Sequence, residues 1–255
     1  MTRVALVTGA AHGQGRATAV ALAKEGYDIV ALDVARQLEY PAYRSGSSAE
    51  LDSLREEIGC QTAIADVRDD AAVSAAVAAA IERFGRIDVL FNNAGICAYG
   101  YAHELTEAEW DAMIDINLKG AWIVARHVIP HMIAANSGVI VNNSSIAGLR
   151  GMGRLSHYAA SKWGLTGLTK SWAIELAPHN IRVVSIHPTG VDTPMNDGLA
   201  EMEGKTTAEI ASLAYLTGVP PSQHSVVKSE YGMKYGPAAS VIVVHQRCAA
   251  FVAPS

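Results

Sequence analysis

The chain has 255 residues, of which half are hydrophobic and 18% are charged, and its formal net charge is -5. A chain of this size and composition can bury one large core, so a second domain is unnecessary. The acidic balance and the lack of Lys/Arg runs argue against a nucleic-acid partner, whose phosphates would require a basic surface.

No apolar run is long enough for a membrane span or a signal peptide, so no membrane association is expected. The three cysteines, Cys60, Cys97 and Cys248, show no CxxC spacing, which is typical of a reducing compartment. We therefore expect a cytoplasmic protein that acts on small molecules.

Six short apolar segments predict buried parallel strands, and helical patterns lie between them. The predicted strands are 3–8, 27–33, 61–66, 87–93, 138–145 and 181–188, and the predicted helices are 14–25, 49–58, 69–84, 106–134 and 156–177. This alternation predicts an α/β fold of the Rossmann type, a doubly wound parallel sheet in three α/β/α layers.

The pattern weakens towards the C-terminus, where Pro and Gly residues interrupt it. We expect residues 1–197 to form the dinucleotide-binding and catalytic core. Residues 198–255 would be an atypical lid and C-terminal segment of the same domain, with a seventh strand at 240–245.

A glycine-rich loop follows the first predicted strand, with glycines at Gly9, Gly13 and Gly15. Such glycines let the chain turn tightly and bring backbone N–H groups and a helix N-terminus against a pyrophosphate. His12 and Gln14 lie in the same loop. The strand before it and the helix after it predict a dinucleotide site.

Two carboxylates end the next two strands. Asp33 lies about twenty residues beyond the loop, where it would accept hydrogen bonds from the adenosine ribose and repel a 2′-phosphate. Arg36 and His12 are the nearby cationic candidates for such a phosphate, so NADP is less favoured and NAD is the predicted cofactor. Asp66 and Val67 would meet the adenine edge, or Asp66 would cap the following helix.

Tyr158 and Lys162 stand four residues apart in a predicted helix, so their heads would share one face. A free tyrosine has a pKa of ~10, and a positive charge ~4 Å away would lower it by about three units. This pair predicts a tyrosine that exchanges a proton near neutral pH.

Together these motifs resemble the short-chain dehydrogenase/reductase family over residues 3–197. The likeness also rests on Asn92-Asn93-Ala94-Gly95, on Asn117 in DINLKG, on Ser145 thirteen residues before Tyr158, and on HPTGVDTP. The resemblance implies an oxidoreductase in which Tyr158 is the general acid or base and Lys162 binds the nicotinamide ribose. Ser145 would polarise the substrate oxygen, and Asn117 would hold a proton-exchanging water.

The resemblance also implies further cofactor contacts. Asn92, Ala94 and Gly95 would lie by the adenosine, whereas Pro188, Val191 and Thr193 would lie by the nicotinamide. His187 and Thr189 depart from the commoner residues of the family. The usual C-terminal pattern is not visible after Glu209, so of the expected homodimer or homotetramer the tetramer is in doubt.

A finer resemblance is to the carveol-dehydrogenase-like branch associated with mycofactocin, because 33–66 carries an inserted YPAYRSGSSAELDSL. It implies a terpenoid or other lipophilic secondary alcohol and a tightly held NAD. The expected pocket wall is small or apolar, and it comprises Ile96, Cys97, Ala98, Tyr99, Met152, Gly153 and Met195, with Ser145 and Tyr158 at the reacting oxygen.

We therefore predict an NAD-dependent oxidoreductase that interconverts a lipophilic secondary alcohol and its ketone. One alternative is an NADPH-dependent reductase of a polyketide or acyl ketone. Another is a regulatory protein that binds a nucleotide without catalysis. His127 and His131 share a helix face but lack further ligands, so no metal is expected.

Overall fold

The computed structural model describes residues 2–213 and 239–242, and its centre is a parallel sheet with strand order β3-β2-β1-β4-β5-β6-β7. The strands are β1 Val4–Thr8, β2 Asp28–Asp33, β3 Gln61–Ile64, β4 Val89–Asn92, β5 Gly138–Asn143, β6 Ile181–Ile186 and β7 Ala239–Ile242. Every neighbouring pair runs parallel. The predicted doubly wound α/β fold is confirmed.

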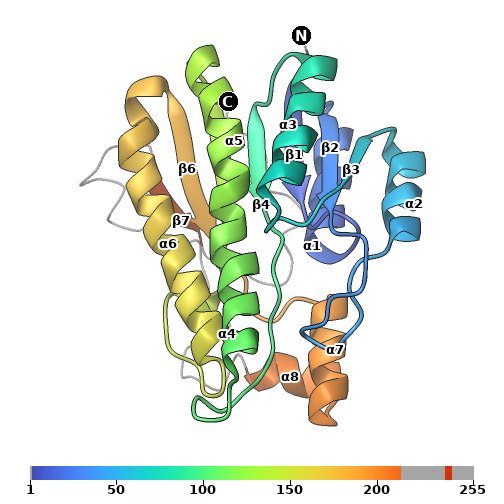
Figure 1. Cartoon of the computed structure of the whole chain (residues 1–255), viewed down its shortest axis with the longest axis vertical. Coiled ribbons are helices and arrows are strands. Elements are labelled where there is room, and N and C mark those ends of the chain that lie inside the picture. Colours follow the sequence, from blue (N-terminus) through green and yellow to red (C-terminus); the bar gives the residue numbers. More distant parts are fainter. Residues whose placement is uncertain (1, 214–238, 243–255) are drawn as a thin grey trace.

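Helices cover both faces of the sheet (Figure 1). They are α1 Gly13–Lys24, α2 Ser48–Ile58, α3 Asp70–Phe84, α4 Glu107–Ile114, α5 Gly120–Ala135, α6 Ser156–Leu176, α7 Pro194–Glu203 and α8 Thr207–Leu213. Leu22 of α1 and Leu54 of α2 bury against one face, and Val77 of α3, Val124 of α5 and Trp172 of α6 bury against the other. The three layers follow from these two apolar cores.

The predicted single helix over 106–134 is wrong in one respect, because a π-helical turn at Asp115–Lys119 separates α4 from α5. Asn117 lies in that turn, and its side chain bonds both the N–H and the carbonyl of Ile96 at 2.8 Å. The wider turn directs a polar side chain at a neighbouring loop, which is a common use of π turns at functional sites.

Two helices lie where the sequence pattern weakens. α7 begins at Pro194 and contains Gly198, where an added Cβ would come within 2.4 Å of the Cβ of Tyr43. This glycine therefore permits close packing and does not end a helix. β7 pairs with β6 and confirms a seventh strand, although residues 243–245 of the predicted strand lie outside the described residues.

The strand order reverses between β1 and β4, so the loops that follow these two strands lead to opposite sides. In open α/β sheets this switch point leaves a crevice at the carboxyl ends of the strands, where ligands bind. The predicted cofactor loop follows β1 at this edge, and the predicted Ser145 follows β5.

Candidate active site

The loop after β1 has the backbone that a dinucleotide requires. Gly9 and Gly13 have φ values of 65° and 56°, and a Cβ on Gly15 would lie 2.0 Å from the carbonyl oxygen of Gly9. His12 begins α1 without a side-chain cap, so the first-turn N–H groups can face an anion. The loop therefore fits a pyrophosphate.

Asp33 lies beside this loop and is 5% exposed. Its two carboxylate oxygens accept the N–H groups of Ala11 and Ala35, each at 2.9 Å. Gly46 packs so closely on Asp33 that an added Cβ would lie 3.0 Å from Oδ1. The carboxylate is thus fixed beside the glycine loop, and its contact with an adenosine ribose stays a prediction.

Asp66 lies at the end of the third strand, but two arginines bind it. Arg68 donates to it at 2.7 Å and Arg36 at 3.0 Å, and these arginines hold the pKa of Asp66 below its usual value although burial acts in the opposite direction. Arg36, a candidate for a 2′-phosphate, is therefore already paired. The helix cap is Asp69, which accepts the N–H of Ala72.

The asparagine pair at the end of β4 divides between two environments. The Asn92 side chain donates to the carbonyl of Ala121 and to Asn142 within the core, away from the cleft. Asn93 instead lines the cleft and donates to the carbonyls of Thr8 and Gly9. Sequence reasoning selected Asn92 and missed Asn93, although alternation along a strand predicts that adjacent residues face opposite sides.

One cleft brings most of the predicted site residues together. Its lining includes Gly9, His12, Gly13, Gln14, Ala94, Gly95, Cys97, Tyr99, Ser145, Met152, Tyr158, Lys162, Pro188, Val191, Thr193 and Met195. Other predicted site residues are outside that lining, namely Gly15, Asp33, Asp66, Val67, Asn92 and Asn117. Val67 is buried in the core.

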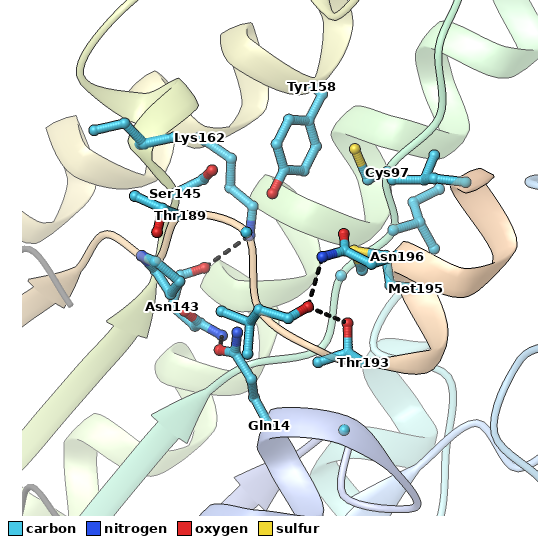
Figure 2. A pocket seen from close by; sticks show the side chains of 18 of the residues that line it. Gln14, Cys97, Asn143, Ser145, Tyr158, Lys162, Thr189, Thr193, Met195 and Asn196 are labelled. Atoms are coloured by element: carbon cyan, nitrogen blue, oxygen red, sulfur yellow. Dashed lines mark hydrogen bonds between the residues drawn. The ribbon is translucent and has the colours of Figure 1, made fainter. Parts of the chain in front are cut away.

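Tyr158 and Lys162 project from α6 into this cleft, and the tyrosine hydroxyl points towards the lysine head (Figure 2). The Nζ of Lys162 lies 5.6 Å from the centre of the Tyr158 ring and donates to the carbonyl of Asn143 at 2.7 Å. Asn143 in turn donates to Gln14 and Asn93, so it joins the lysine to the cofactor loop. Asn143 is a further lining residue that sequence reasoning missed.

The expectation that Lys162 lowers the pKa of Tyr158 is wrong when the effects of the protein's own groups are considered. Burial raises the pKa of Tyr158 above its usual value, and hydrogen bonding with Ser145 only partly opposes it. Burial also lowers the pKa of Lys162 to about 8. Removing both heads from water is the largest effect on each pKa, and it raises that of the phenol while it lowers that of the ammonium.

The two adjacent serines after β5 have different surroundings. Ser144 donates to the carbonyl of Lys162 at 3.0 Å and so ties the end of β5 to the second turn of α6. Ser145 lines the cleft, its Oγ accepts the N–H of Ala147 at 3.1 Å, and its hydroxyl also hydrogen-bonds with Tyr158. Ser145 thus lies in the same cleft as Tyr158, and its role towards a substrate oxygen stays a prediction.

Asn117 connects the π turn to α6. Its amide donates to Ser161 at 3.1 Å, and its Oδ1 would lie 3.2 Å from a Cβ added at Gly95. A Cβ at Gly95 would also lie 3.5 Å from the Nζ of Lys162. Gly95 thus lets the π turn, the lysine and the cleft loop approach one another.

The loop after β6 forms the remaining side of the cleft. The carbonyl of Val191 accepts bonds from Thr193 and Asn196 (Figure 2). Its carbonyl is therefore engaged within the protein, and any pairing with a carboxamide would use its N–H.

Much of the remaining cleft wall is apolar, although Thr189 and Asn196 also line it. Besides the predicted Cys97, Tyr99, Met152 and Met195, it includes Leu155, Leu199 and Ile210, whereas the predicted Ala98 and Gly153 are absent from its lining. Leu199 and Ile210 come from α7 and α8, helices that the sequence pattern did not predict.

Tyr43, from the inserted segment, supports this wall. Its hydroxyl accepts the N–H of Cys97 at 3.1 Å, and its ring packs against the buried cluster that includes Cys97, Leu155 and Leu199. Nearby, the hydroxyl of Tyr40 bonds to His157, next to Tyr158, at 2.9 Å. The inserted segment therefore contacts the pocket and is not a free surface loop.

The remaining candidates lie apart from the cleft. His127 bonds to Asp70 at 2.9 Å, and Arg154 pairs with Glu203 across the pocket rim. Over the described ranges, no group of three or more His, Cys, Asp or Glu side chains could hold a metal ion. Over the same ranges, no helix is both long and apolar enough to cross a membrane.

Comparisons with known proteins agree with this geometry. The short chain dehydrogenase family model matches residues 3–204. The chain belongs to the short-chain dehydrogenase/reductase family. It is therefore an NAD(P)-dependent oxidoreductase.

Individual relatives indicate a branch of the family. The chain is 44% identical over 205 residues to a (-)-trans-carveol dehydrogenase of Rhodococcus erythropolis. The matched region covers 77% of this chain and 74% of that protein. A carveol dehydrogenase of Mycobacterium avium, solved with NAD, has a TM-score of 0.77 at 30% identity and covers 95% of this chain and 96% of its own. A short chain dehydrogenase of Mycobacterium paratuberculosis bound to NAD has a TM-score of 0.81 at 33% identity, with 98% of each chain covered. The chain is thus similar to carveol dehydrogenases, as the finer resemblance predicts.

Proposed function

We propose that the protein uses NAD to interconvert a lipophilic secondary alcohol and its ketone. The observation that carries this proposal is one cleft in which Tyr158, Ser145 and Lys162 face the glycine loop at one end and an apolar wall at the other. Such a cleft holds a dinucleotide and a lipophilic substrate side by side.

NAD is the dinucleotide favoured by Asp33. Its buried carboxylate can accept bonds from ribose hydroxyls, and its charge disfavours a 2′-phosphate. Arg36, which could otherwise receive that phosphate, is paired with Asp66. The NAD-bound relatives support the same choice.

The roles follow from position. When bound, NAD accepts or returns a hydride. Tyr158 would take the proton of the alcohol or return it to the ketone, and Ser145 would donate a hydrogen bond to the reacting oxygen. Lys162 would hold the ribose. Asn117 would hold a water for proton exchange and keep the π turn against α6.

The substrate would be lipophilic because the described wall offers sulfur, aromatic and aliphatic groups. Lys162 is the one Lys or Arg among the lining residues, and Arg154 at the rim is paired with Glu203. Similarity to carveol dehydrogenases supports a terpenoid alcohol. The inserted segment packs Gly46 against His12 and Asp33, which supports a tightly held cofactor.

A cofactor-release and turnover assay tests this proposal. Purified protein is denatured and the supernatant analysed for NAD, while native protein is given carveol, an aliphatic secondary alcohol or a sugar alcohol, with free NAD or an artificial electron acceptor. We expect turnover of carveol and the aliphatic alcohol. Released NAD with activity only in the presence of the acceptor would support tight retention, and oxidation of the sugar alcohol alone would contradict the lipophilic substrate.

We also expect the chain to associate with copies of itself. Large apolar side chains on α4, α5 and α6 are exposed, namely Trp110, Trp122, Trp163 and Ile174. Sedimentation velocity that finds a monomer throughout the micromolar range would contradict this expectation.

A further inference from the structure

A buried histidine lies directly beside the candidate catalytic serine. His187 follows the last residue of β6 and is 0% exposed. Beyond the end of the β5–β6 pairing, Ser144 donates to the carbonyl of Ile186 at 2.9 Å and Ile146 donates to the carbonyl of Pro188 at 3.0 Å. These two bonds continue the β5–β6 register, so His187 lies level with Ser144 and one position from Ser145.

The imidazole joins the two strands through both nitrogens. Nδ1 lies 2.8 Å from the carbonyl oxygen of Ser145, and Nε2 lies 2.9 Å from the hydroxyl of Ser185. A carbonyl can only accept, so Nδ1 carries the hydrogen, and Nε2 of the neutral ring accepts from Ser185. Burial lowers the pKa of His187, and the charge of Lys162 acts in the same direction, which keeps the ring neutral.

The bond to His187 fixes the peptide group that follows Ser145. That carbonyl accepts a second bond, from the N–H of Gly148 at 2.9 Å, while the Ser145 Oγ accepts from Ala147. Together these contacts set the direction of the peptide plane on which the serine side chain is mounted. A hydroxyl that must meet a substrate oxygen within a few tenths of an ångström depends on such support.

We propose that His187 is a positioning residue that holds Ser145 for the reaction through the chain Ser185–His187–Ser145. This inference rests on the proposed role of Ser145 in turnover. It gives His187 a function at a position where the sequence departs from the commoner residues of the family. The histidine touches neither substrate nor cofactor in this role.

A matched pair of substitutions tests the hydrogen bond. His187→Asn keeps an N–H donor at the δ position, whereas His187→Leu has similar bulk and no donor. We expect His187→Leu to lower kcat about 10- to 100-fold, the range associated with small misplacement of a reacting group. His187→Asn should retain kcat within about fivefold of the original protein, and both should bind NAD with unchanged affinity.

Repeating the leucine substitution in a Ser145→Ala background separates positioning from a general structural effect. If His187 acts through Ser145, adding His187→Leu to the Ser145→Ala protein should lower kcat by less than about a further threefold. An undiminished loss, or a His187→Leu protein as active as the original, would overturn the proposal. If His187→Leu does not fold, Ser185→Ala serves instead, because it removes the partner of Nε2, and its loss of kcat should likewise vanish when Ser145 is alanine.

Nitrogen-15 NMR of the imidazole gives a readout that does not depend on turnover. The signals of His187 are those that disappear in His187→Asn. We expect a neutral ring protonated at Nδ1 throughout the range from pH 6 to 8. A ring protonated at Nε2 would overturn the proposal even if the protein oxidised no alcohol tested, whereas a correct tautomer without alcohol turnover would count against the proposed function alone.

Discussion

Replacing Tyr158 with phenylalanine should lower kcat for alcohol oxidation by about 1,000-fold, within the range that a positioned acid or base contributes. The change removes one hydroxyl from a packed ring and leaves Lys162 bonded to the carbonyl of Asn143. Affinity for NAD and the melting temperature should therefore stay close to those of the original protein. Steady-state kinetics with the best alcohol, together with equilibrium NAD binding, measures both quantities.

Tyr99→Phe is the matched control for this experiment. Tyr99 lines the same cleft, but it belongs to the apolar wall and stacks under the guanidinium of Arg154. Its loss of a hydroxyl should change kcat by less than about threefold. If Tyr158→Phe kept activity within fivefold, Tyr158 would not be the acid-base group, and a nucleotide-binding protein without this chemistry would be favoured.

Asp33→Ala should reverse much of the preference for NAD over NADP, with the ratio of the two kcat/KM values falling about 100-fold. That change corresponds to about 2.7 kcal/mol, which is the scale of a hydrogen bond to a buried charge. Part of the loss will appear as lower stability, because the N–H groups of Ala11 and Ala35 lose their acceptor. Because the lost stability affects activity with both cofactors equally, the ratio of the two kcat/KM values does not depend on it.

Asp33→Asn and Asp69→Ala complete this series. Asn keeps the shape of the side chain without its charge and should reproduce most of the shift. Asp69 caps α3 and lies outside the cleft lining, so its replacement should reduce stability and leave the cofactor ratio unchanged. A ratio that stays constant in Asp33→Ala would favour the NADPH-dependent ketoreductase.

The features predictable from sequence are those set by local rules. Apolar strand patterns, glycine spacing and the four-residue helical interval can each be recognised within a few neighbouring residues. From them the sequence predicts the glycine loop, Asp33, Ser145 and the Tyr158–Lys162 pair on α6. The roles proposed for these residues stay predictions until kinetics tests them.

The features that sequence did not predict depend on distant contacts. The π turn at Asn117 follows from bonds to Ile96, and the helical conformation around Gly198 follows from packing against Tyr43. The pKa of Tyr158 was misjudged because a spacing rule gives the nearby charge but not the burial that opposes it.

Transfer of deuterium from the carbinol carbon of the alcohol tests the central claim most directly. Protein with bound NAD is mixed with the best secondary alcohol carrying deuterium at that carbon, and the reduced cofactor is analysed by mass spectrometry. We predict one deuterium in the reduced cofactor and slower turnover than with unlabelled alcohol. Tyr158→Phe should form the labelled cofactor about 1,000-fold more slowly. Reduced cofactor without deuterium, or ketone formed while NAD stays oxidised, would contradict hydride transfer in this cleft.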